Sequence, residues 1–144
     1  MKVMAFEQVT SDNRNPLVSN DSHFMTLISL TEKFGQISEH WRPKIVAQAN
    51  GQELKLVKFK GVFPWHLHEL EDEIFLVWKG TMRIEFRDRT VPLTQGELCV
   101  VPRGIEHRTC AENEAEVMIF EPAATRNTGN VHDERFTAPI DDRI

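Results

Sequence analysis

The sequence predicts an all-β fold, a sandwich or a closed barrel, with one short helix on its N-terminal side. Its 144 residues suit one domain with one core. Short runs rich in β-branched and aromatic residues follow one another through 44–122, with turn-forming residues between them. No long helical pattern lies between these runs, which disfavours a parallel sheet with crossover helices. We expect an arm and the helix over 1–43, the barrel over 44–122 and a tail over 123–144, all in one domain.

The helix is expected over 22–34, where apolar residues recur close to the helical period. Asp21 or Ser22 can cap its start, and Gly35 can end it. The chain before the helix, rich in turn-forming residues, is expected to be extended.

The strands are expected to be short and bounded by turns. A turn at 112–114 is expected to separate the last two. The expected strands are Lys44–Ala47, Glu53–Lys60, Trp65–His68, Glu73–Lys79, Thr81–Arg87, Thr90–Leu93, Glu97–Val101, His107–Cys110 and Ala115–Glu121.

The composition argues against several classes of partner. The formal charge of -5 disfavours binding to nucleic acid and to anionic membranes. No apolar run approaches the roughly 20 residues that span a bilayer. Cys99 and Cys110 do not make a disulfide framework, and the apolar stretch near the N-terminus is too short for a signal peptide. We therefore expect a cytoplasmic protein whose partner is a small molecule.

Three histidines and one glutamate form a candidate metal site. His66 and His68 are two residues apart on an expected strand, so both imidazoles point to the same face. Two neutral imidazoles side by side are natural metal ligands. Glu73 opens the next run, and a hairpin would return its carboxylate towards the two histidines. A second segment, farther along the chain, adds His107 as a third imidazole.

These residues resemble the first motif of the cupin superfamily. That motif has a glycine, then His-x-His, a glutamate after four further residues and a glycine after six more. The matching residues are Gly61, His66, His68, Glu73 and Gly80. The first glycine stands one residue closer to the first histidine than is usual in the family.

The second cupin motif is also present. It has a glycine, five residues, Pro-x-Gly, two residues and a histidine, and Gly96, Pro102, Gly104 and His107 match it. The asparagine that often follows four residues after the histidine is replaced by Ala111, which is no loss for metal binding because that asparagine is not a ligand.

The resemblance covers about 44–122 and looks closest to small single-domain cupins of the type called mannose-6-phosphate-isomerase-like. These carry a similar Trp-His-x-His…Asp-Glu-x-Phe pattern, here within 65–75, and a similar Glu-Pro…Asn-Thr-Gly ending, here within 121–129.

The resemblance implies a conical antiparallel barrel, the double-stranded β-helix or jelly roll, with a metal inside its wider mouth. It implies His66, His68, Glu73 and His107 as ligands of one divalent ion, with two positions left open in six-coordination. Zn, Fe, Mn, Ni and Cu all tolerate such ligands, so the ion is not distinguished. The alternative is that these four residues are ordinary polar core residues.

The function expected from these observations is a divalent-metal-binding cupin that acts as a metalloenzyme on a small polar molecule, with the reaction left open. One alternative is a non-catalytic module that binds a metal or a small ligand. Another is a defined enzyme, either a sugar or sugar-phosphate isomerase or epimerase, or an Fe or Ni dioxygenase. No side chain is framed as a catalytic base, which counts against isomerisation.

Several neighbouring residues have weaker claims to a role. Arg83, Arg103 and Arg108 could hold an anionic substrate, although exposed arginines without such a role are more common. Asp72 could orient a ligand imidazole, although a solvated acidic turn is the simpler interpretation.

The strand Glu73–Lys79 is apolar on both faces, so one face can line the barrel while the other needs a cover. A second copy of the chain would supply that cover in a homodimer. The helix over 22–34 is the alternative cover.

Overall fold

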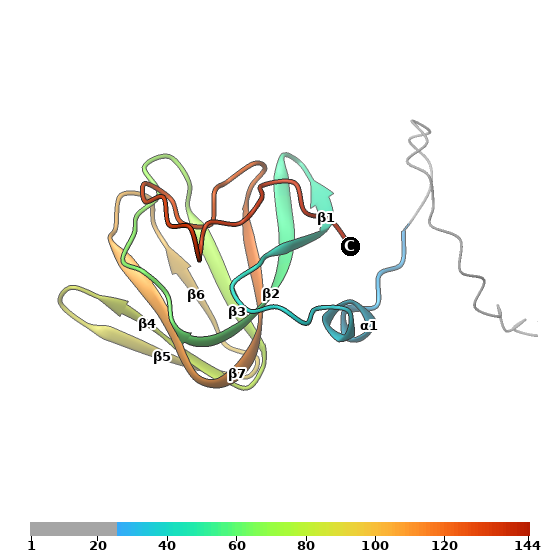
Figure 1. Ribbon diagram of the computed structural model, residues 1–144, viewed down its shortest axis with the longest axis horizontal. Coiled ribbons are helices and arrows are strands. Elements are labelled where there is room, and N and C mark those ends of the chain that lie inside the picture. Colours follow the sequence, from blue (N-terminus) through green and yellow to red (C-terminus); the bar gives the residue numbers. More distant parts are fainter. Residues whose placement is uncertain (1–25) are drawn as a thin grey trace, which may run out of the picture.

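In the computed structural model, which describes residues 26–144, seven strands form one antiparallel sheet that curves around a hydrophobic core (Figure 1). The elements are α1 (Leu30–Gly35), β1 (Lys44–Ala49), β2 (Gln52–Val62), β3 (Glu73–Lys79), β4 (Thr81–Phe86), β5 (Thr90–Thr94), β6 (Leu98–Val101) and β7 (His107–Pro122). The predicted all-β jelly-roll barrel with one short helix is confirmed. The predicted N-terminal arm and the first residues of the predicted helix lie outside the described residues.

The helix α1 begins later than the sequence predicts. Residues 26–29 are not helical, so the prediction of a helix over 22–34 is wrong there, whereas its end at Gly35 is confirmed. The hydroxyl of Ser29 caps the helix by accepting a hydrogen bond from the backbone N–H of Glu32 at 3.3 Å. A serine three residues before a glutamate is a strong start signal, and it outweighs the weaker apolar periodicity upstream.

Strand β7 is continuous, so the predicted turn at 112–114 is wrong. Those three residues are exposed, and the pairing of β7 with β2 shifts between Phe59 and Gly61. The turn-forming residues are therefore accommodated as a β-bulge, in which Gly61 adopts a positive φ of 94°. On either side of the bulge β7 pairs with different strands, with β4 before it and with β3 after it.

The segment around His66 and His68 is not a regular strand, which corrects the prediction of a strand over 65–68. It makes one isolated antiparallel bridge, in which the backbones of His66 and His107 exchange hydrogen bonds of 3.0 and 2.9 Å. The next backbone groups are taken by the C-terminal segment: the N–H of Leu67 donates to Asn130 Oδ1 at 2.9 Å, and the N–H of Asn130 donates to the Leu67 carbonyl at 3.0 Å. A loop thus replaces the strand partner that the sequence pattern implies.

The core has two parts, one inside the barrel and one under the helix. The inner part is rich in aromatic side chains, and Phe136 from the C-terminal tail packs edge-on against Trp41 and Phe63. The outer part joins Phe34 of α1 to Leu56 and other residues of the sheet. The tail therefore packs against the core of the barrel through Phe136.

The apolar outer face of β3 is covered only in part. Phe34 stacks on Trp78 with ring centroids 6.4 Å apart, so α1 supplies the alternative cover. On the neighbouring strand β6, Leu98 and Val100 remain 57% and 52% exposed. The homodimer therefore stays a prediction: we expect a dimeric mass in sedimentation or light scattering, which Leu98→Glu should convert to a monomeric one. A monomeric mass for the unaltered chain would contradict it.

Within residues 26–144, no helix combines the length and the apolar character that a membrane crossing requires. The cytoplasmic location stays a prediction.

Candidate metal centre

Two parts of the chain, the stretch from His66 to Glu73 and the start of β7 at His107, bring these three side chains to one point inside the barrel. His66 lies between β2 and β3, Glu73 is the first residue of β3 and His107 the first of β7. All three side chains are buried, and one ligand atom of each lies within 4.8 Å of the others. Histidine nitrogens and a carboxylate oxygen at this separation form a group that could hold a metal ion.

His68 also points at this group but lies outside its tightest part. Its Nε2 is 3.2 Å from Glu73 Oε2, the same distance that separates His107 Nε2 from this oxygen. Its ring centroid is 5.2 Å from that of His66 and 6.2 Å from that of His107. The structure therefore brings the four sequence-predicted residues together, with Glu73 between two imidazoles. We call these four residues the His/Glu cluster.

The cluster contains buried polar atoms that nothing in the described part of the chain satisfies. His68 Nε2 and His107 Nε2 each lie 3.2 Å from Glu73 Oε2, but none of these three atoms makes a hydrogen bond of acceptable geometry with the described residues. Buried polar atoms are otherwise almost always paired, because an unpaired one costs about 1–3 kcal/mol. Three such atoms aimed at one point fit the requirements of a cation, which all three could bind at once.

The outer nitrogens of two imidazoles fix the tautomer that metal binding requires. His66 Nδ1 lies 3.0 Å from the Pro64 carbonyl, and His107 Nδ1 lies 3.0 Å from the Ile105 carbonyl. Because a carbonyl oxygen only accepts, Nδ1 carries the proton and donates it in both residues. The lone pair of each Nε2 is then free to point into the cluster.

The charges of the cluster also suit a metal. Burial, followed by the neighbouring His107, lowers the pKa of His66 to about 4, so its imidazole is neutral near pH 7. Burial by itself would raise the pKa of Glu73, but the contacts with His107 and His68 outweigh it and the pKa is lowered. A neutral imidazole and an ionised carboxylate are the forms that bind metal ions.

The C-terminal segment positions the His-x-His segment, a contribution that sequence reasoning missed. Gly129 lies so close to this backbone that an added Cβ would overlap the Leu67 carbonyl oxygen and lie 3.3 Å from Cδ2 of His66. Together with the two hydrogen bonds between Leu67 and Asn130, this contact holds both histidines from behind. The available signal was the Asn-Thr-Gly ending at 127–129, which contributed to the sequence-based prediction only as part of a family resemblance.

The arginines and the acidic turn do not take part in the cluster. Asp72 accepts from Nε and Nη2 of Arg103, both at 3.0 Å, rather than from a ligand imidazole. Arg83 and Arg108 each donate to Glu85, at 2.8 and 2.6 Å. All three arginines are therefore paired with carboxylates, and these contacts do not favour the anion-holding role.

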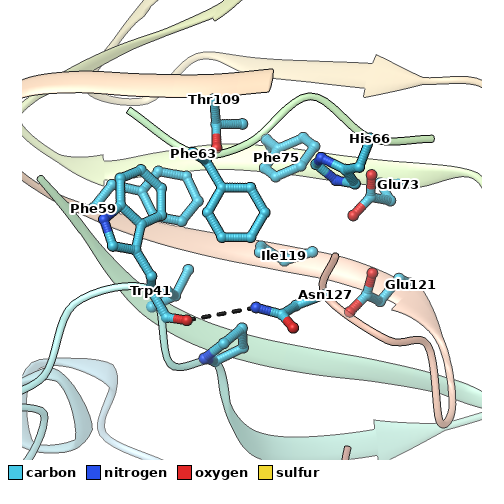
Figure 2. Close-up of a pocket in the computed structure, with 12 residues that line it drawn as sticks. Trp41, Phe59, Phe63, His66, Glu73, Phe75, Thr109, Ile119, Glu121 and Asn127 are labelled. Atoms are coloured by element: carbon cyan, nitrogen blue, oxygen red, sulfur yellow. Dashed lines mark hydrogen bonds between the residues drawn. The ribbon is translucent and has the colours of Figure 1, made fainter. Parts of the chain in front are cut away.

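A cavity adjoins the cluster on the inside of the barrel, and Figure 2 shows its lining residues. Its walls are mostly aromatic and aliphatic, with the polar side chains of His66, Glu73, Thr109, Glu121 and Asn127. The space open to the centre of a water molecule is about 20 Å³, enough for about one water. His68 lines a different and wider hollow of about 640 Å³, which is open to solvent and bordered by Glu69, Glu71 and Arg126 among others. The cluster thus lies between an inner apolar cavity and an outer polar hollow.

A small jelly-roll barrel with a buried His/Glu cluster and an adjoining cavity defines the class of this protein. The chain belongs to the cupin superfamily, as comparison with known proteins shows: residues 55–122 match the family described as Cupin domain.

Two proteins of known structure resemble this chain over nearly their whole lengths. One, a cupin-2 domain containing protein from Shewanella frigidimarina, is 43% identical, covers 67% of this chain and 94% of its own, and superposes with a TM-score of 0.66.

The other is NMB1881 from Neisseria meningitidis, 31% identical over 67% of this chain and 99% of its own, with a TM-score of 0.63. Protein YdbB of Bacillus subtilis is 32% identical, over 53% of this chain and 77% of that protein. These similarities establish the family. The mannose-6-phosphate-isomerase-like subtype stays a prediction.

Proposed function

We propose that this cupin binds one divalent metal ion through His66, His68, Glu73 and His107, and that the ion acts on a small molecule as part of an enzyme. Two observations carry the proposal. Ligand atoms of His66, Glu73 and His107 lie within 4.8 Å of one another, and buried atoms of His68, Glu73 and His107 have no hydrogen-bond partner among the described residues. A cation among these atoms would remove the cost of leaving them unpaired and would neutralise the buried carboxylate of Glu73. A polar core without an ion offers no comparable compensation.

The ligand set accommodates Zn, Fe, Mn, Ni or Cu, because imidazole and carboxylate are ligands that all these ions accept. When bound, the ion would polarise an oxygen of the small molecule. The surrounding cavity supports a catalytic role, since its apolar walls keep bulk water away from the reacting group and strengthen electrostatic interactions there. The alternative, a non-catalytic module, needs the same metal site but does not need the adjoining cavity.

Metal analysis of matched histidine variants tests the proposed site. We expect protein purified without added metal, or loaded with Zn or Mn, to contain about one ion per chain. His66→Ala should lower the affinity at least about 10–100-fold, the loss typical even of residues that only support a ligand. His132→Ala is the control, because this histidine is exposed and lies outside the cluster.

Inductively coupled plasma mass spectrometry and calorimetric titration would measure the metal content and the affinity. Circular dichroism would establish that both variants are folded. The metal site would be contradicted if the unaltered protein contained no ion after incubation with Zn or Mn. Equal affinity in the two variants would contradict it as well.

A further inference from the structure

The cavity beside the His/Glu cluster contains one more acidic side chain, Glu121, which no ligand assignment uses. We propose that Glu121 is the proton-transfer residue of this site, acting on a small hydroxycarbonyl compound, an inference that rests on the proposed metal function. The sequence left two kinds of chemistry open, isomerisation or epimerisation on one side and oxygenation on the other. A residue that transfers protons favours the first kind.

Glu121 lies near the C-terminal end of β7 and is 1% exposed. It lines the same cavity as His66 and Glu73, and Figure 2 shows these three side chains towards one end of the cavity, with Trp41 and Phe59 towards the other. One carboxylate oxygen, Oε1, accepts a hydrogen bond from Lys55 Nζ at 2.8 Å. The other, Oε2, is buried and has no partner among the described residues. A carboxyl oxygen left free beside a candidate metal site is placed to exchange a proton with a molecule in the cavity.

Lys55 holds Glu121 in place. Its ammonium is buried and also donates to the Thr125 carbonyl at 3.1 Å, and it lies 3.3 Å from Glu53 Oε2. Glu53 has a second cation, Arg143, at 3.7 Å. The two carboxylates thus share one buried ammonium, and only Glu121 among them lines the cavity. Glu53 Oε2 also lacks a hydrogen bond, so the position in the cavity wall, rather than the unpaired oxygen, distinguishes Glu121 from Glu53.

The surroundings make the Glu121 carboxylate a stronger base than an exposed one. Burial raises its pKa, and the nearby negative charge of Glu73 adds to this, while Lys55 opposes it; the result is a pKa of about 8. A catalytic acid or base works best when its pKa lies near the working pH. A bound cation would lower this pKa, so that more of the group is ionised near neutral pH and can accept a proton.

The reaction that such a residue supports is redox-neutral. The Glu121 carboxylate takes the proton from the carbon next to a carbonyl group, the C–H electron pair forms a C=C bond, and the carbonyl π electrons move to its oxygen. The resulting carboxylic acid returns the proton, either to the same carbon or to the neighbouring one, and is ionised again. The first outcome is epimerisation or exchange. In the second, the hydroxyl proton on the first carbon also passes to the former carbonyl oxygen as the new C=O forms, so that a hydroxyketone becomes a hydroxyaldehyde or the reverse. The cavity has room for about one water molecule, so only the reacting group itself can enter it and the rest of the molecule has to lie outside.

Exchange of solvent deuterium into hydroxyacetone and dihydroxyacetone, followed by proton NMR, tests the proposal with metal-loaded protein. The unaltered chain should exchange the carbon-bound protons next to the carbonyl well above the metal-only background. Glu121→Gln should lower the rate constant about 100-fold or more, the size of a general-base contribution, with KM and metal content little changed. Glu114→Gln is the matched control: it makes the same substitution on the same strand, at a half-exposed carboxylate that pairs with His40 and does not line the cavity, and it should leave the rate within a few-fold.

Metal content separates the possible failures. No exchange by a fully loaded protein, or equal rates in the unaltered protein and Glu121→Gln, would overturn the role of Glu121 while leaving the metal site standing. A protein that binds no metal would overturn both. If Glu121→Gln does not fold, Glu121→Asp keeps the charge but withdraws the carboxylate by one methylene; it should exchange at least about 10-fold more slowly, and an unchanged rate would overturn the proposal.

Discussion

Replacing Gly129 by alanine is expected to destabilise the protein by about 3 kcal/mol or more and to abolish metal binding. The residue has φ of 52°, in the left-handed region, and an added Cβ would overlap the Leu67 carbonyl oxygen and lie 2.9 Å from the carbonyl carbon. Both obstacles are backbone atoms, so no side-chain rotation relieves the clash. Relief requires the 128–130 loop or the His-x-His segment to move, and either movement displaces His66 and His68 from Glu73.

A second glycine provides the control for backbone strain. Gly51 also has a positive φ, 75°, but an added Cβ there would meet nothing within 4 Å. Gly51→Ala should therefore cost only the strain of the left-handed conformation, about 1–2 kcal/mol, and should leave metal affinity unchanged. Urea unfolding and calorimetric metal titration of both variants measure the two effects. Equal stability and equal affinity in the two would show that the loop does not position the histidines.

Replacing Lys55 by methionine is expected to cost about 3–5 kcal/mol, because it removes the ammonium that two buried carboxylates share. Glu53 and Glu121 are 3% and 1% exposed, so neither can turn to water for compensation. Taking away all three polar groups together should restore most of the loss, since apolar residues of similar shape can replace a buried ion pair at little cost. The triple variant Glu53→Met/Lys55→Met/Glu121→Met provides that comparison.

Lys58→Met is the matched control for this experiment. It makes the same substitution on the same strand, but the ammonium of Lys58 lies 3.8 Å from a half-exposed carboxylate, that of Glu114. Such pairs contribute about 0–1 kcal/mol. Denaturant unfolding curves give the free energy of unfolding of the unaltered chain, Lys55→Met, the triple variant and Lys58→Met. A loss below about 1 kcal/mol for Lys55→Met, similar to that of the control, would mean that the buried cluster does not depend on its ammonium.

The His/Glu cluster was predictable because its spacing is local. Two histidines on alternate residues of an extended segment share a face whatever surrounds them. Glu73 follows His68 after only four intervening residues. His107 is farther away along the chain, and only the second cupin motif indicated that it belongs with the others. The structure places all four together, which was expected, while the extended segment that carries the first two histidines is held by a loop rather than by a sheet.

Glu121, Lys55 and Gly129 were not predicted, because nothing local distinguishes them. Lys55 and Glu121 are 66 residues apart, and each stands in an ordinary strand pattern in which a charged residue normally faces water. Gly129 touches a backbone segment more than 60 residues away in the chain, so the local sequence does not show that a side chain at this position would clash. The late start of α1 is the opposite case, since the Ser29 and Glu32 pair was a local signal that apolar periodicity obscured.

By itself, the sequence determined the class of fold, the alternation along an extended segment that turns His66 and His68 to one side, and the chemistry of the candidate ligands. These are consequences of neighbours along the chain, where backbone geometry alone decides direction. Only the tertiary structure decided that three ligand atoms are left without partners, that a cavity adjoins them and that Glu121 reaches it with a free oxygen. Burial and unmet hydrogen bonds depend on several distant segments at once, and they exist only after those segments have packed together.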